Sequence, residues 1–416
     1  MLSVMTSGRS GKKRIYRDLV TLLVASWIMA MHIGNKVGIY LSDIAAAFGR
    51  VFKQDMLAKC RRAGASDCFL TFLSEFLAPR RASVIVDGVS SDPFTIEDMV
   101  FQGTHFGPPL WNAFFADVSG PAASNGAKPT KFADDLNTYK SYPADTALEE
   151  VLSDLKRGQQ AVHQWGAENR VSFGPGKEVF AVVHPRFAHG PDFKLLGAIF
   201  DTKLTMTSCI EATMRKVTPK IKALLRTRPY YSTSDLVRQY KTHVLGLAEA
   251  NIGAIYHATQ TVLEPLDRSL DIFLRDLKLD ARSAFLGHNM APLSMRRDIA
   301  MLGFLHKRML GDTHADICSL LPLFLEPEAR RCTRFRSDRP SRLFQETFDG
   351  THPALIRRSI FGLTRIYNKL PQHIVDNESC NEFQHHLNVY AKDRCRAGAP
   401  EWRMIFSPRR ELYGHL

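Results

Sequence analysis

Two adjacent aspartates, Asp134 and Asp135, stand between one strand-like run that ends at Phe132 and another that begins at Leu136. This arrangement predicts a hairpin with both carboxylates at its tip. Two like charges about 4 Å apart repel each other by about 4 kcal/mol at an effective dielectric constant of about 20. A divalent cation removes that repulsion, and carboxylates are ligands that Mg²⁺ prefers. Adjacent acids are also common in solvated turns, so the pair alone leaves both interpretations open.

Asp43 is the third acidic candidate because it follows a predicted buried strand, Val37–Leu41. If this strand end meets the Asp134–Asp135 hairpin, three carboxylates could hold two Mg²⁺ ions about 3.5–4 Å apart. Such a pair of ions suits the in-line attack of a hydroxyl on a phosphate. Asp43 taken alone could equally be a helix cap or a turn residue.

The elements that must position these acids form an α+β pattern, which becomes almost wholly helical from Ile210 onward. Besides the segments already named, the predicted strands are Arg81–Asp87 with Pro93–Val100, Val179–Val183, and a hairpin in which Phe193–Phe200 and Leu204–Met206 flank Asp201–Lys203. The predicted helices are Leu19–Met31, Gln54–Arg62, Asp67–Leu77, Pro108–Val118, Ala147–Asn169, Thr213–Thr227, Ser234–Ile255, Pro265–Leu277 and Arg296–Met309. An Arg-rich linker is expected over Glu328–Phe344.

Composition points to a polyanionic partner in a reducing compartment. The chain carries 55 Lys and Arg against 42 Asp and Glu, a net charge of +13. Its seven cysteines include no C-x-x-C pair, which argues against disulfides and zinc fingers. We therefore expect an intracellular protein of the nucleus or cytoplasm. The apolar run Leu19–Met31 imitates a secretory signal but is too short to span a bilayer, so we expect a buried helix and no membrane partner.

Five ordered blocks resemble the reverse transcriptases of non-LTR (LINE-like) retrotransposons. The first three blocks are similar to the family's motifs A, B and C: Asp43-Ile-Ala-Ala-Ala-Phe48, Gln102-Gly-Thr-His-Phe-Gly-Pro-Pro-Leu-Trp-Asn112 and Phe132-Ala-Asp-Asp135. Trp165–Lys177 resembles motif D, and Phe193–Gly197 through Leu204 resembles the strand pair that grips the primer end. Further similarity continues to Tyr367–Pro371 and Phe383.

The resemblance implies a right-hand polymerase. It predicts partial fingers and a palm, an antiparallel sheet with packed helices, over residues 1–208. A helical thumb over 209–310 and a helical C-terminal region over 311–416 would follow. It also implies that the chain is truncated at its N-terminus, because it begins at what resembles the second fingers block, Ser7–Ser10.

The resemblance also implies roles for individual residues. Asp43, Asp134 and Asp135 would be catalytic acids that bind two Mg²⁺ ions, with Mn²⁺ as a substitute and Asp135 as the peripheral ligand. Phe48 would lie under the sugar of the incoming nucleotide and exclude a 2′-hydroxyl, although it could instead be a core residue. Gln102 and Gly103 would contact the template and nucleotide. Lys177 would donate a proton to pyrophosphate, unless it is an ordinary surface lysine.

The helix predicted over Thr213–Thr227 carries several cations, among them Lys216, Lys220, Lys222 and Arg226. They would contact the backbone of a template–primer duplex, or they form a solvated helix face. Two hypotheses of function remain. The chain is an RNA-directed DNA polymerase whose partners are an RNA template, a DNA primer and dNTPs, or it is an inactive, truncated retroelement relic that only binds nucleic acid.

Overall fold

The computed structural model describes residues 16–44, 49, 51–96, 100, 103–174, 176, 178–324, 343–346 and 349–409. The chain forms two compact units. The first contains the described residues between 36 and 183 together with 187–190, and the second contains the remaining described residues. The structure is α+β, with antiparallel strand pairs and a largely helical second unit. The boundaries of palm, thumb and C-terminal region stay predictions.

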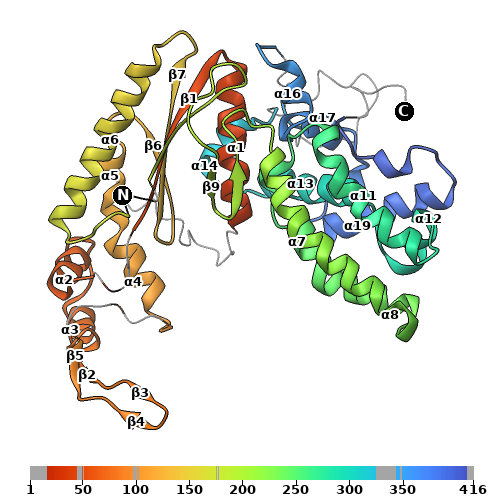
Figure 1. Cartoon of the computed structure of the whole chain (residues 1–416). Coiled ribbons are helices and arrows are strands. Elements are labelled where there is room, and N and C mark those ends of the chain that lie inside the picture. Colours follow the sequence, from red (N-terminus) through yellow and green to blue (C-terminus); the bar gives the residue numbers. More distant parts are fainter. Residues whose placement is uncertain are drawn as a thin grey trace. The chain divides into compact units, whose positions relative to one another are not determined.

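A four-stranded sheet with the order β6-β7-β1-β8 forms the centre of the first unit (Figure 1). Its strands are β1 (Asn35–Asp43), β6 (Lys128–Phe132), β7 (Asp135–Pro143) and β8 (Val179–Val183). Every residue of β1 between its two terminal positions is buried. The predicted strand at Val37–Leu41 and the predicted hairpin around the two acids are confirmed.

Helices and one further hairpin complete the first unit. Its helices are α2 (Lys53–Arg62), α3 (Asp67–Phe76), α4 (Gly107–Phe114), the 3₁₀ turn η2 (Ala116–Val118), α5 (Ser119–Ala122) and α6 (Leu148–Glu168). Their apolar faces share one core, in which Trp111, Phe114 and Trp165 are among the largest buried side chains. The helix predicted over Pro108–Val118 is split, because α4 ends at Phe114 and η2 follows.

The predicted strand pair beyond residue 80 is a hairpin of two short ladders. In the outer ladder β2 (Arg80–Ala82) pairs with β5 (Phe94–Ile96), and in the inner ladder β3 (Ile85–Val86) pairs with β4 (Val89–Ser90). The chain therefore turns at Asp87 and Gly88, so the second arm of the hairpin begins at Val89, before the predicted start at Pro93.

The described part of the second unit is helical apart from one small hairpin and an isolated bridge between Leu323 and Phe344. Its elements are β9 (Phe193–Leu195), β10 (Ala198–Phe200), α7 (Thr207–Arg226), η4 (Arg228–Tyr230), α8 (Thr233–Tyr240), η5 (Lys241–Leu245), α9 (Gly246–Ala248), α10 (Ile252–Ile255), α11 (Gln260–Asp276), α12 (Ala281–His288), α13 (Leu293–Met309), α14 (Ala315–Leu320), α16 (Pro353–Arg357), α17 (Ile360–Asn368), α18 (Gln372–Val375), α19 (Cys380–Arg396) and η6 (Trp402–Met404). Helix α7 packs against α11, and α13 packs against α19 and α17.

The first helix in the sequence, α1 (Tyr16–His32), belongs to this second unit, where it packs against α10, α14 and α16. Thr351 ties its C-terminal end, because the Thr351 amide donates to the His32 carbonyl at 2.9 Å and its hydroxyl donates to the Met31 carbonyl at 2.8 Å. The predicted buried helix at Leu19–Met31 is confirmed. None of the helices in the described ranges combines the length and apolar character that a bilayer crossing needs.

The structure of the second unit departs from two sequence predictions and leaves a third untested. The hairpin expected around Asp201–Lys203 is wrong: the strands are β9 and β10, and the chain turns at Leu196 and Gly197, whose φ angles are 48° and 86°. The helix expected over Ser234–Ile255 is interrupted, because the helical run formed by α8, the π-helical segment η5 and α9 ends at Ala248 and α10 begins only at Ile252. The Arg-rich linker lies almost wholly outside the described residues.

Candidate active site

The two aspartates of the predicted hairpin occupy its turn and the start of its second strand. Phe132 pairs with Asp135 across the β6–β7 ladder, which leaves Ala133 and Asp134 as the two turn residues. Ala133 adopts a left-handed conformation with φ of 54°. Both aspartates are partly exposed, so either carboxylate can reach a ligand from solvent.

Asp43 lies at the same end of the sheet as this turn. The Ser42 hydroxyl donates to the Leu136 carbonyl at 3.3 Å, which puts the last residues of β1 beside the first residues of β7. At the opposite end, Lys36 near the start of β1 donates to the carbonyl of Thr146, beyond the end of β7. The two strands therefore run antiparallel, and the backbones of Asp43 and Asp135 come together at neighbouring strand ends.

The donor chemistry at this end of the sheet fits Mg²⁺, since carboxylate oxygens are the ligands that it prefers. Within the described ranges no three His, Cys, Asp or Glu side chains lie close enough to hold a metal ion together. The three-carboxylate metal site expected from the sequence stays a prediction.

Helix α4 supports the turn from the core. The indole Nε1 of buried Trp111 donates to the carbonyl of Ala133 at 2.8 Å. From the strand side, Lys131 donates to the carbonyls of Phe115 at 3.2 Å and Ala116 at 2.9 Å, just beyond the C-terminal end of α4. Burial lowers the pKa of Lys131 to about 8, although Asp117 acts in the opposite direction.

A second lysine caps the same helix end. Lys59 of α2 donates to the Phe114 carbonyl and to Asp117 Oδ1, both at 2.8 Å, and its ammonium lies 4.3 Å from the centre of the Phe114 ring. Burial lowers the pKa of Lys59, and the bond to Asp117 opposes that shift. Cations suit this position because the carbonyls at a helix C-terminus lack intrahelical donors. Trp165 Nε1 also donates to Asp117 Oδ1, at 3.0 Å.

The segment that resembles motif D passes the end of β1. The Gly174 amide donates to the Asp43 carbonyl at 3.1 Å. Further along, the Glu178 carboxylate accepts bonds from Tyr40 of β1 and from Gln159 and His163 of α6. Burial and the neighbouring Glu178 both raise the pKa of Tyr40. Of the predicted residues in this region, Lys177 lies outside the described residues.

Two other predicted residues, Phe48 and Gln102, also lie outside the described residues. Gly103 is described, exposed, and has a φ of 82°. A side chain would be strained in this left-handed conformation, so the position favours glycine for its backbone shape. Their roles in binding nucleotide and template stay predictions.

The cations predicted to grip a duplex lie on one exposed face of α7. Arg215, Lys216, Lys220, Lys222 and Arg226 are all exposed, while Ile210, Val217, Ile221 and Leu224 form the buried face of the helix. Within the described ranges none of these five cations pairs with a carboxylate. Two exposed tyrosines follow the helix, with Tyr230 83% and Tyr231 49% exposed. Binding of nucleic acid here stays a prediction.

The residues around the site to which sequence reasoning gave no role are polar side chains of the first unit, of which Lys59 and Trp111 are buried and Asp117 is exposed. They are Lys59, Trp111, Asp117, Lys131 and Glu178. Their partners are backbone carbonyls or side chains on other elements, so no local pattern could indicate them.

Comparison with known proteins supports the motif-based resemblance. No family model matches the sequence. The chain is 26% identical to the curated "RNA-directed DNA polymerase from mobile element jockey" of Drosophila funebris over 220 residues, which are 48% of this chain and 24% of that protein. The chain thus spans about a quarter of the length of this relative. The resemblance to the reverse transcriptases of non-LTR retrotransposons is therefore confirmed as a distant relationship that covers about half of the chain.

Proposed function

We propose that this chain is an RNA-directed DNA polymerase that extends a primer 3′-hydroxyl with dNTPs. The observation that carries the proposal is the meeting of Asp43 and Asp135 at neighbouring strand ends, with Asp134 in the adjoining turn. The distant similarity to a polymerase from a mobile element supports the same chemistry.

The reaction joins the primer oxygen to the α-phosphorus of a dNTP. The bond from that phosphorus to the β-phosphate oxygen breaks, pyrophosphate leaves, and the hydroxyl proton passes to water. Mg²⁺, when bound, would supply positive charge beside the phosphates and the attacking oxygen. Asp43 and Asp134 would hold it, with Asp135 as the peripheral ligand, and Lys177 would protonate the departing pyrophosphate.

The remaining predicted residues select and hold the substrates. Phe48 would lie beneath the deoxyribose and exclude a 2′-hydroxyl, while Gln102 and Gly103 would line the template and nucleotide. The cationic face of α7 would contact phosphates of the template–primer duplex without regard to sequence. The surplus of positive charge in the whole chain suits such partners.

Primer extension on an RNA template tests the proposal. The unmodified chain with Mg²⁺ should extend a DNA primer, and Asp134→Asn should lower the rate at least about a hundredfold, as loss of one charge-stabilising group typically does. Asp145→Asn is the matched control, because Asp145 is an exposed acid just beyond the far end of β7. Equal loss in both variants would contradict a role for the turn.

One observation favours the alternative, an inactive chain that only binds nucleic acid: the described side chains form no group of three metal ligands. The same experiment separates the two functions. If the unmodified chain binds the RNA–DNA duplex but never extends the primer, the polymerase proposal is wrong and the binding function stands.

A further inference from the structure

The turn that carries Asp134 is held from beneath by a buried side chain. Ala133 is exposed and has a left-handed φ of 54°, a conformation that alanine rarely adopts. Its carbonyl accepts the hydrogen bond from Trp111 Nε1, and the Trp111 side chain is 1% exposed. The indole also stacks on the Phe115 ring, with 5.2 Å between ring centroids, so the donor has little freedom to move.

A second contact joins the strand before the turn to the same helix. Lys131, two residues before Ala133, donates to two carbonyls just beyond the end of α4, and its ammonium lies 5.8 Å from the centre of the Phe115 ring. The turn and the strand leading into it are therefore each bonded to the segment Trp111–Ala116. Two contacts restrain both the position and the orientation of the turn, which a single contact cannot do.

We propose that Trp111 and Lys131 are positioning residues that clamp the Ala133–Asp134 turn against α4 and so set the place of the Asp134 carboxylate. The predicted effect of this clamp on catalysis rests on the proposed function, whereas its effect on the turn does not. Neither residue needs to touch substrate, because both act through the backbone. A site that must hold reacting groups within a fraction of an ångström depends on such support.

Trp111→Phe removes the indole donor and keeps an aromatic ring in the core. Without the bond, the turn should open more often, and amide hydrogen exchange in the segment 130–137 should become about fivefold faster, the effect of losing one net hydrogen bond. The rate of primer extension should fall about tenfold at saturating dNTP, with little change in the KM for dNTP, since the clamp places a carboxylate and binds no nucleotide.

Tyr142→Phe is the matched control. Tyr142 is also a buried aromatic residue of the same core, and its hydroxyl donates to Asp154 instead of the turn. It should leave exchange in 130–137 and the extension rate within about twofold of the wild type. Lys131→Met should repeat the effect of Trp111→Phe, while Lys128→Met, at an exposed position of the same strand, should not.

The exchange measurement needs no activity, so the two proposals can fail separately. If no variant extends a primer but Trp111→Phe and Lys131→Met still accelerate exchange in 130–137, the clamp stands and the polymerase function fails. If exchange in Trp111→Phe matches the wild type, or changes equally in Tyr142→Phe, the clamp is wrong.

Discussion

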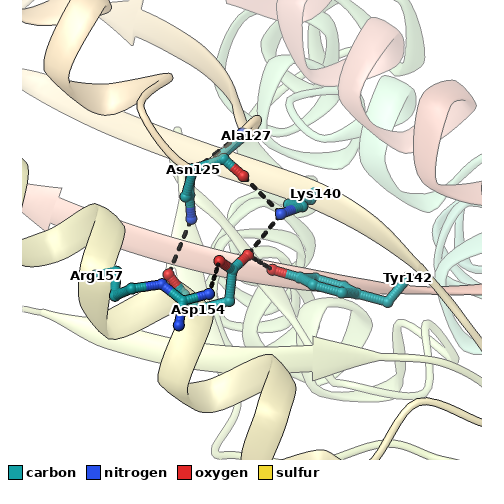
Figure 2. A network of polar contacts seen from close by, with 6 residues as sticks. All are labelled: Asn125, Ala127, Lys140, Tyr142, Asp154 and Arg157. Carbon is teal, nitrogen blue, oxygen red and sulfur yellow. Dashed lines mark hydrogen bonds and ion pairs between the residues drawn. The ribbon is translucent and has the colours of Figure 1, made fainter.

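Asp154 of α6 accepts hydrogen bonds from several elements of the first unit. Its carboxylate accepts from Lys140 and Tyr142 of β7, both at 2.7 Å, and from Arg157 of α6 at 2.6 Å (Figure 2). The Asp154 side chain is 8% exposed. Its backbone carbonyl accepts from Asn125, which also bonds the Ala127 amide. The Asp154 carboxylate thus ties α6 to β7, and its backbone carbonyl ties α6 to the loop before β6.

Replacing this carboxylate should destabilise the first unit. Asp154→Ala leaves Tyr142 and Lys140 without their acceptor, and we expect the free energy of unfolding to fall by about 2–3 kcal/mol. A fully buried ion pair would lose about 3–5 kcal/mol, and the difference arises because Arg157 and part of Lys140 reach solvent. Urea unfolding at pH 7 measures the change.

The control for Asp154→Ala is Asp145→Ala, at an exposed acid in the same region, which should change stability by less than about 0.5 kcal/mol. Acid provides a second test. Burial raises the pKa of Asp154, but its three donors outweigh burial and leave the pKa below the ordinary value of 3.8. The contribution is therefore present above pH 4 and disappears as the pH falls below it, so the variant and the wild type should converge there. A constant gap would contradict this role.

At the scale of elements, local patterns predicted the helices and strands whose hydrophobic period is strong. The β6–β7 hairpin was found because two apolar runs flank Asp134 and Asp135. The hairpin expected around Asp201 was wrong for a physical reason: the Asp201 carboxylate accepts from the amides of Lys203, Thr205 and Met206, so these residues form a capped loop before α7. A turn-forming residue does not reveal whether strands follow it.

The candidate site was predictable only in its exposed part. Asp43 and the hairpin acids follow from strand ends and turn chemistry. Lys59 and Lys131 could not be predicted, because an isolated lysine in a sequence normally indicates solvent exposure, and only tertiary structure supplies the carbonyls that these two bind. The same holds for the contact between Trp111 and Ala133, which are 22 residues apart.

One prediction concerns the exposed cationic face of helix α7. If its exposed face contacts phosphates, replacing Lys216, Lys220 and Lys222 with Ala should weaken binding of an RNA–DNA duplex. The slope of log K against log salt concentration should also become shallower by about 2–3, because a protein that contacts fewer phosphates releases fewer counterions when it binds. Fluorescence anisotropy across a salt series measures both effects.

A control with the same charge change comes from three exposed cations on or next to other helices. Arg238→Ala, Arg268→Ala and Lys278→Ala together remove three charges, and Arg238 and Arg268 are already paired with Asp235 and Glu264. This variant should keep the wild-type slope. If both triple variants flatten the slope equally, binding responds to net charge and α7 has no special place in it.

At the scale of the whole second unit, His257 joins three distant parts of the chain. Its Nε2 bonds the Leu204 carbonyl at 3.1 Å, and its own carbonyl accepts from Arg358 at 2.7 Å. The residue is 1% exposed, and its Nδ1 has no partner among the described residues. Burial, with the nearby Arg358 and Arg409, lowers the pKa of His257 to about 4, although the bond to the Leu204 carbonyl and the Asp201 carboxylate act in the opposite direction.

Asp298 is also buried in this unit, and its pKa is shifted upward, whereas that of His257 is shifted downward. It accepts from the Tyr256 hydroxyl at 2.7 Å, and burial raises its pKa to about 6 although Arg409, Tyr256 and Arg297 favour the carboxylate. Between pH 4 and pH 6 the folded chain therefore holds a proton on Asp298 that the unfolded chain mostly lacks. Over the same range the unfolded chain holds a proton on His257 that the folded chain lacks. The two contributions to the pH dependence of stability offset each other.

His257→Gln should remove one side of this balance. The variant no longer takes up a proton at residue 257 on unfolding, whereas Asp298 still releases one. Its free energy of unfolding should therefore rise relative to the wild type by up to about 1.4 kcal/mol per pH unit as the pH falls from 6 to 4.

Asp298→Asn should show the reverse trend over the same range, a relative loss of stability on acidification. Urea unfolding of the second unit at half-unit pH steps measures both slopes, and His243→Gln, at an exposed histidine of η5, should follow the wild type. Parallel curves for His257→Gln and the wild type would mean that His257 is protonated in the folded chain, and that solvent reaches the junction of residues 204, 257 and 358.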